Sequence, residues 1–298
     1  MCILLPKGLI NLDINMKKII IIIVCCFPLI AKSSNLDDKP VYYGLGLCDY
    51  PQYECVKVGS GQSWEKLFPD EGQRDLVQRV NRTYNSLSTG KQIVVPKDLA
   101  HVTIFDLSPF PLQIADENQK QIIVDQDKLA WGAYDQHGNL VKWGPISSGS
   151  DRCSDNSSPT CRTMTGIFQV FSKENERCKS NIFPVGKGGA KMPYCMYFHK
   201  GLALHGSPDI PGYRASHGCV RMFVRDAKWL NEQWVDASNA SNNFMGTKVI
   251  VRPITYSGKP LSPSQLGSAK ITKRSKSTNT AWVNPDSNFP ATPSERIQ

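Results

Sequence analysis

Short segments with strand character fill residues 121–251, and only one long helix stands out among them. Seven segments of alternating or continuous apolar residues predict strands at 121–124, 128–134, 140–147, 166–172, 196–199, 202–205 and 247–251. Turn residues such as His137-Gly138-Asn139 lie between them, as expected where neighbouring strands run antiparallel. This spacing predicts a mainly β domain with a mostly antiparallel sheet.

The single long helix is expected from Val224 to about Val235. Phe223, Ala227, Leu230 and Trp234 recur at helical spacing, which predicts one apolar face that packs on the sheet. The tryptophans are expected to belong to the core and not to a stacking platform: Trp131, Trp143, Trp229 and Trp234.

A smaller unit is expected before the sheet domain. From Val56 to Pro96 the pattern predicts a strand, a Gly-Ser-Gly turn, helices at about 64–68 and 75–81, and a strand at 92–95. This β-α-α-β order resembles a LysM domain, with Asn81 and the closing run Gly90–Pro96 carrying the resemblance. The resemblance implies a wall-binding domain at 41–99, and a plain spacer domain is the alternative.

Both ends of the chain have the character of segments outside a folded core. Lys17-Lys18, the twelve apolar residues 19–30 and the small residues after them predict a secretory signal over residues 1–33, read from Met1 or from Met16. Twelve apolar residues are too few for a membrane span, so no transmembrane anchor is expected after processing. Ser, Thr, Pro, Lys and Asn dominate residues 257–298, which predicts a disordered basic tail. We therefore expect an exported protein of the periplasm or cell envelope.

A proline-containing stretch at 100–118, which includes Ser108-Pro109-Phe110-Pro111, predicts a linker between the two domains. The formal charge of the chain is +9, and removal of residues 1–33 lowers it to about +6 because four lysines and one aspartate leave. A positive charge fits an acidic partner. No nucleic-acid motif accompanies it, so an anionic envelope is favoured over nucleic acid.

The cysteines add a second constraint. Ten are present, and seven remain after the signal segment: Cys48, Cys55, Cys153, Cys161, Cys178, Cys195 and Cys219. An odd number in an oxidising compartment leaves one thiol over. Closeness in sequence suggests the pairs Cys48–Cys55, Cys153–Cys161 and Cys178–Cys195, although other connectivities stay open. This pairing would leave Cys219 free.

Chemistry is concentrated around Cys219. His205, His217 and Cys219 fall within fifteen residues, at the end of a predicted strand and across a Pro-Gly loop. A thiolate forms readily beside an imidazole and is a good acyl nucleophile, so a cysteine with a histidine base is the favoured interpretation. Zinc is the alternative, but three ligands without a CxxC or HExxH pattern make it the weaker one. We expect no metal and no cofactor.

The same residues resemble a known family. His205-Gly206 and Ser216-His217-Gly218-Cys219-Val220-Arg221 are similar to the signature of the L,D-transpeptidase (YkuD-type) catalytic domain. Three further pieces agree with it: Ser147-Ser148-Gly149, Thr163–Phe168 and Met192-Pro193-Tyr194. The resemblance covers about residues 121–252 and implies a catalytic domain at 119–254 with an L,D-transpeptidase-like β-sandwich or sheet fold.

The resemblance also implies roles. Cys219 would be the acylated nucleophile, His205 the proton acceptor and donor, and the Gly206 carbonyl would orient the imidazole. Oxyanion or substrate-binding positions fall to Ser216, His217, Gly218, Arg221 and Tyr194. Arg221 would hold a substrate carboxylate.

The implied reaction is acyl transfer on peptidoglycan. The Cys219 thiolate would attack the L,D-peptide bond of a tetrapeptide stem, and an amine would resolve the thioester. The acceptor could be another stem peptide or the lysine of an outer-membrane lipoprotein, whereas water would make the protein an L,D-carboxypeptidase. The alternative from another class is a non-catalytic protein that binds wall glycan through the LysM-like domain.

Overall fold

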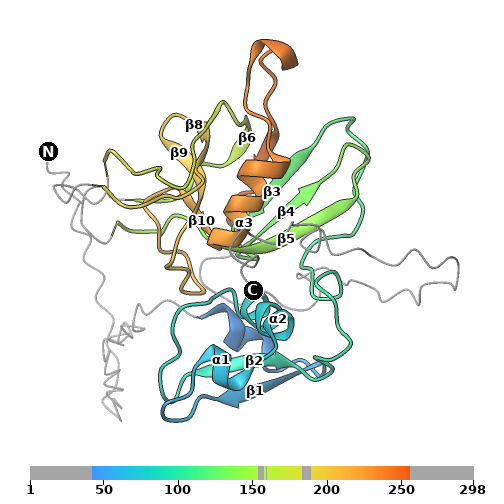
Figure 1. Ribbon diagram of the computed structural model, residues 1–298, viewed down its shortest axis with the longest axis vertical. Helices are drawn as coiled ribbons and strands as arrows, with labels where there is room; N and C mark the ends of the chain where they lie inside the picture. Colours follow the sequence, from blue (N-terminus) through green and yellow to red (C-terminus); the bar gives the residue numbers. More distant parts are fainter. Residues whose placement is uncertain (1–41, 154–157, 159, 183–188, 256–298) are drawn as a thin grey trace, which may run out of the picture. The chain divides into compact units, whose positions relative to one another are not determined.

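The computed structural model describes residues 42–153, 158, 160–182 and 189–255 (Figure 1). The predicted signal segment at 1–33 and the predicted tail at 257–298 lie outside the described residues. No helix in the described part of the chain is both long enough and apolar enough to span a bilayer.

Within the described residues, the segment 121–251 contributes a nine-stranded sheet with the order β6-β11-β3-β4-β5-β10-β9-β8-β7. Its strands are β3 (Gln121–Asp125), β4 (Ala130–Tyr134), β5 (Leu140–Ser147), β6 (Gly166–Gln169), β7 (Ser172–Lys173), β8 (Met196–His199), β9 (Leu202–Gly206), β10 (Val220–Met222) and β11 (Lys248–Val251). The mainly β architecture predicted from the sequence is confirmed. Two neighbouring pairs in this sheet are parallel, β9 with β10 and β3 with β11, and the others are antiparallel.

The sheet curls because the segment 166–173 provides both of its edge strands, β6 and β7. β6 pairs with β11, and β7, three residues later, pairs with β8. Between them the Val170 amide donates to Thr247 O and the Phe171 amide to Tyr197 O, so the chain changes partner at this point. The sequence predicted one continuous strand over 166–172, and this change of partner is the reason that it is divided.

The main core lies within the curl. Alternation along β3 sends Ile122 and Val124 into this core, while Ile123 faces a second apolar cluster. A helical segment packs on the main core: α3 (Val224–Trp229) is followed by one π-helical turn, η2 (Leu230–Trp234). The helix predicted from Val224 to about Val235 is thus present, with its second half widened.

The residues expected to form a linker pack on the second cluster. Phe110 is buried there against Trp143 and Tyr134, and the Trp143 indole donates to Ile104 O at 2.5 Å. The Tyr134 hydroxyl donates to Pro111 O at 2.8 Å. The stretch 100–118 therefore covers one face of the sheet.

Residues 42–99, called the βααβ segment below, have the expected order of elements. They comprise η1 (Tyr43–Leu47), β1 (Tyr53–Lys57), α1 (Trp64–Leu67), α2 (Glu71–Asn81) and β2 (Gln92–Pro96), with β1 and β2 antiparallel. Helix α2 begins four residues before the predicted start, because the Asp70 carboxylate caps it by accepting from the Gln73 amide at 2.8 Å. The buried Asn81 side chain donates to Val94 O at 2.6 Å and accepts from the Val94 amide at 2.9 Å, which fixes α2 to β2.

The described residues contain three disulfides: Cys48–Cys55, Cys153–Cys161 and Cys178–Cys195. They join the same cysteines that sequence proximity paired. Cys219 is the free cysteine of the described residues.

Candidate active site

Parallel pairing of β9 and β10 determines which side chains share a face. Arg221 lies opposite His205 and Val220 opposite Leu204, so Cys219, directly before β10, lies beside Ala203. Side chains alternate along a strand, and opposite residues point to the same side. His205, Cys219 and Arg221 therefore share one face, while Leu204, Val220 and Met222 enter the main core behind them.

His205 is buried, with 5% of its surface exposed. Its Nδ1 lies 2.8 Å from Gly206 O, and because a carbonyl can only accept, Nδ1 carries the proton and Nε2 keeps a lone pair. Burial lowers the pKa of the imidazole to about 4, against the opposing effect of the Gly206 hydrogen bond and with a smaller contribution from the Arg221 charge. His205 is thus a neutral base at neutral pH.

Cys219 is a neutral thiol in this environment. Its Sγ donates to Gly201 O at 3.6 Å, and its side chain packs against Ala203 and the Cys178–Cys195 disulfide cluster. Burial raises the pKa of the thiol, and a backbone hydrogen bond with Ala203 and the Arg221 charge oppose this rise. Because the thiol and the imidazole on this face are both neutral, the sulfur becomes a nucleophile only when its proton is transferred to a base.

The turn that carries Cys219 is fixed by Ser216, which is 2% exposed. The Ser216 hydroxyl donates to Cys219 O and accepts from the Gly218 amide at 3.1 Å. Gly218 has a φ of +115°, a conformation that side chains rarely adopt. The Ser216 side chain and the Gly218 amide are therefore used within the turn itself.

The end of β5 supports this turn from below. The Ser216 amide donates to Ser148 O at 3.0 Å, and Gly149 forms a parallel bridge with Ser216. A Cβ on Gly149 would lie 1.9 Å from Cys161 O, so this close approach requires glycine. The Gly149 amide donates to Thr163 Oγ1 at 2.9 Å, which brings together two pieces that the sequence singled out separately.

Arg221 has a carboxylate partner of its own. Its Nη1 donates to Asp209 Oδ2 at 2.9 Å, and 22% of the Arg221 side chain remains exposed. Asp209 is more than half exposed and belongs to residues 207–219, the β9–β10 loop. The guanidinium is thus oriented at the surface and keeps donors for a further anion.

The first half of the β9–β10 loop is bound by the βααβ segment. The Asn85 amide side chain donates to Asp209 Oδ1 at 2.7 Å and accepts from the Ile210 amide at 2.8 Å. The Tyr84 hydroxyl donates to Ser207 O, and the Tyr43 amide donates to Gly212 O at 3.0 Å.

A buried ion pair joins the same two parts of the fold. The Arg79 guanidinium on α2 binds Asp226 on α3 through Nη1 at 2.9 Å and Nη2 at 2.8 Å, and both side chains are almost fully buried. Arg79 Nη1 also donates to Trp143 O at 2.8 Å.

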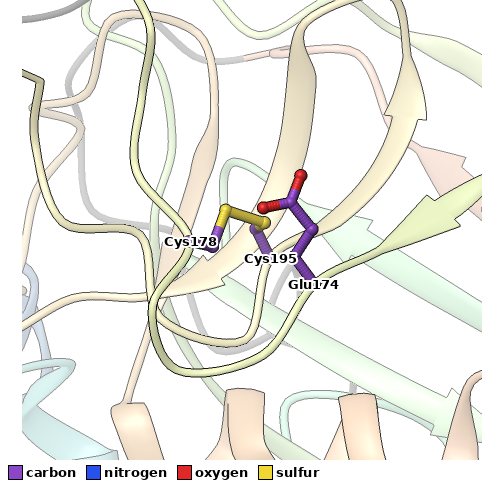
Figure 2. Close-up of side chains that lie close together, drawn as sticks. All are labelled: Glu174, Cys178 and Cys195. Atoms are coloured by element: carbon purple, nitrogen blue, oxygen red, sulfur yellow. A yellow bond between two sulfur atoms is a disulfide. The ribbon is translucent and has the colours of Figure 1, made fainter.

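Figure 2 shows a group of potential metal ligands in the described residues, Glu174 with Cys178 and Cys195. The two sulfurs are joined in a disulfide, so neither is a thiolate ligand. The cluster is part of the wall beside Cys219.

In comparison with known proteins, residues 119–251 match the family model of the L,D-transpeptidase catalytic domain, YkuD. The sheet domain is thus similar to L,D-transpeptidase catalytic domains. The chain is 27% identical over 161 residues to a Bacillus subtilis (strain 168) protein named "Putative L,D-transpeptidase YciB", covering 50% of this chain and 79% of that protein. It is 24% identical over 223 residues to "Probable L,D-transpeptidase ErfK/SrfK" of Escherichia coli (strain K12), covering 67% of each. A crystal structure of the L,D-transpeptidase from Xylanimonas cellulosilytica has 26% identity and a TM-score of 0.43, over 60% of this chain and 78% of that chain.

The sheet domain brings His205, Gly206, Cys219 and Arg221 together at one pair of strands. His217 is half-buried in the same turn. Tyr194 has a φ of +58° and its amide donates to Asn175 O at 3.0 Å, on the segment that leads into β8.

Sequence reasoning missed Asn85 and Asp209. Asp209 could have been noticed as the acidic residue within the signature region, twelve positions before Arg221. No local signal marks Asn85, because its partner is 124 positions away in the sequence.

Proposed function

We propose that the protein is an exported peptidoglycan L,D-transpeptidase that uses Cys219 as its nucleophile. The observation that carries the proposal is the shared face of β9 and β10, where the free Cys219 thiol, the neutral His205 imidazole and the Arg221 guanidinium lie together. The family of residues 119–251 supports the same reaction class.

In the first half-reaction, His205 Nε2 takes the proton of the Cys219 thiol while the sulfur attacks the carbonyl carbon of the L,D-peptide bond after the third stem residue. The S–C bond forms, the C–N bond breaks, and the leaving D-residue takes the proton from His205. Gly206 O keeps the imidazole in the required tautomer throughout.

In the second half-reaction an amine attacks the thioester, gives its proton to His205, and the thiolate leaves and is reprotonated. A stem-peptide amine gives a cross-link, and a lipoprotein lysine gives an attached lipoprotein. Water would give a shortened stem. The cycle uses protons that the side chains exchange, and it needs no cofactor.

The βααβ segment is proposed to bind wall glycan as a LysM-like domain, and residues 1–33 to direct export to the periplasm or cell envelope. Binding of the purified full protein to insoluble peptidoglycan, with and without soluble peptide-free glycan strands as competitor, tests the first point. Fractionation of cells that express the full chain tests the second.

The main experiment incubates the full protein with a disaccharide tetrapeptide and follows the products by mass spectrometry. Wild type should release the terminal D-residue and form dimers, and Cys219→Ala should lose at least about 10³-fold of this rate. His205→Gln should lose a comparable amount, while His101→Gln, at an exposed histidine, should match wild type.

Tripeptide without dimers would assign the carboxypeptidase reaction. Unchanged stems with wild-type protein, or equal rates with Cys219→Ala, would overturn the enzymatic proposal and favour a wall-binding protein. A carbapenem adduct on wild type and its absence on Cys219→Ala would be an independent measure of the nucleophile.

A further inference from the structure

The Arg221 guanidinium is oriented through a series of contacts that begins in the βααβ segment, outside the catalytic domain. Asn85 in the βααβ segment binds Asp209 Oδ1, and Asp209 Oδ2 binds Arg221 Nη1. The two oxygens of one carboxylate therefore connect a residue of the N-terminal part to Arg221, on the face that carries Cys219.

Asn85 itself is fixed at several points. Its side-chain oxygen accepts from the Ile210 backbone amide at 2.8 Å. Its backbone amide donates to Thr83 Oγ1 at 3.1 Å, and its backbone carbonyl accepts from the buried Trp64 indole at 2.9 Å. A side chain fixed in this way can set the position of a partner, because little freedom is left to it.

Asp209 would not take this position without help. It is more than half exposed, and an exposed ion pair with Arg221 alone would contribute little and would leave both side chains mobile. The Asn85 side-chain amide binds the carboxylate itself at 2.7 Å, and the Ser207 hydroxyl fixes the backbone beneath it by accepting from the Asp209 backbone amide at 3.1 Å.

We infer that Asn85 and Asp209 are positioning residues for Arg221, so that the βααβ segment sets how strongly the enzyme recognises the terminal carboxylate of its acyl donor. The inference rests on the proposed function and on the role that the family resemblance implies for Arg221, which is to hold a substrate carboxylate. It assigns the N-terminal part a role in donor recognition that is separate from glycan binding.

The test measures KM and kcat of the full protein with two donors, a tetrapeptide stem with a free terminal carboxylate and the same stem with a C-terminal amide. Asn85→Ala and Asp209→Asn should each raise KM for the carboxylate donor about tenfold, with a smaller change in kcat. With the amide donor, both variants should match wild type, because no carboxylate is left to be recognised.

Asp209→Asn keeps the size of an exposed side chain, so it serves as the variant that folds if Asn85→Ala does not. The matched control is Asn242→Ala, which also removes two side-chain hydrogen bonds, to the Asn239 amide and to Ala237 O, in the η3 (Ala240–Asn242) turn. It should leave KM for both donors unchanged.

Equal KM values for wild type and Asp209→Asn with the carboxylate donor would overturn the inference, and so would equal losses with both donors. Arg221→Ala distinguishes carboxylate binding by Arg221 from the positioning of Arg221 by Asp209. If Arg221→Ala raises KM for the carboxylate donor and Asp209→Asn does not, only the positioning role fails. If wild type acts on neither donor, the proposed function fails and the inference fails with it. If wild type is active and Arg221→Ala changes KM for neither donor, Arg221 does not bind the carboxylate and the inference fails alone.

Discussion

The two halves of the β9–β10 loop are supported in different ways. Residues 213–219 rest on the end of β5, through Ser147, Ser148 and Gly149, within the catalytic domain. Residues 207–212 are bound mostly from outside it, by Tyr43, Tyr84 and Asn85 of the βααβ segment. The half that carries the nucleophile is thus internal to the fold, and the half that carries Asp209 depends on a second part of the chain.

This difference suggests that nucleophile geometry and donor recognition can be changed separately. The turn at Ser216 needs only the sheet, whereas the position of Asp209 needs the βααβ segment. Variants on each side should therefore have different effects on stability and on activity, and the sizes of these effects test the comparison.

The largest effect is expected from Arg79→Met. It leaves Asp226 buried without its partner, which should lower the free energy of unfolding by about 3–5 kcal/mol. Urea denaturation measures this change. The double variant Arg79→Met/Asp226→Leu should recover most of it, because replacement of a buried ion pair by apolar residues is often neutral.

The matched control is Glu176→Gln, which breaks an exposed pair with Arg177 and should cost at most about 1 kcal/mol. If Arg79→Met is as mild as this control, the βααβ segment does not depend on the ion pair, and the contrast between the two halves of the loop is weakened.

Acid should lower the stability of the part of the site that lies within the sheet domain, through protonation of His205. Its pKa is about 4 in the folded protein and near 6.5 when exposed, so between these values the unfolded state holds more protons. The contribution of His205 to the free energy of unfolding is fully present above pH 6.5 and is lost as the pH falls to 4. The total loss is about 3 kcal/mol.

Urea midpoints at pH 7, 5.5 and 4 measure this loss. His205→Gln should reduce the dependence on pH, whereas His101→Gln, at a solvent-exposed site, should not. A pH dependence that is the same in His205→Gln and wild type would place the sensitive group elsewhere.

The smallest effect is expected from Ser216→Ala. It should lower the free energy of unfolding by about 1–3 kcal/mol, because the Gly218 amide and Cys219 O each lose a buried partner. Acylation of Cys219 should slow, while KM for the free carboxylate should change little because Asp209 keeps its contacts. Ser241→Ala, at an exposed hydroxyl, is the control. A rise in KM equal to that of Asp209→Asn would show that the two halves of the loop are not independent.

Local sequence patterns were sufficient for most of the fold. The alternation of apolar residues located β3, β4, β5, β8, β9 and β11, and helical spacing located α3. Strand β10 was missed because only three residues pair and they fall within the catalytic signature. The parallel pairings of β9 with β10 and of β3 with β11 join distant segments, so no local pattern encodes them.

In the site, too, some residues could be predicted from local sequence patterns and others could not. The signature at 216–221 pointed to Cys219 and Arg221, and the strand before it pointed to His205. It did not show that Ser216 satisfies its own turn, since a hydroxyl has the same appearance in a motif whether it binds substrate or backbone. Asn85 could not be found, because its role exists only when residues 124 positions apart meet.

The Arg79–Asp226 pair also has a consequence for how the chain folds. The two residues are 147 positions apart, so Arg79 is synthesised long before its main partner. Until α3 is complete, Arg79 has Asp75, one helical turn away at 2.6 Å, as a local counterion. Closing so large a loop is a late and slow event, so the βααβ segment is expected to reach its final packing only when the last third of the catalytic domain has folded.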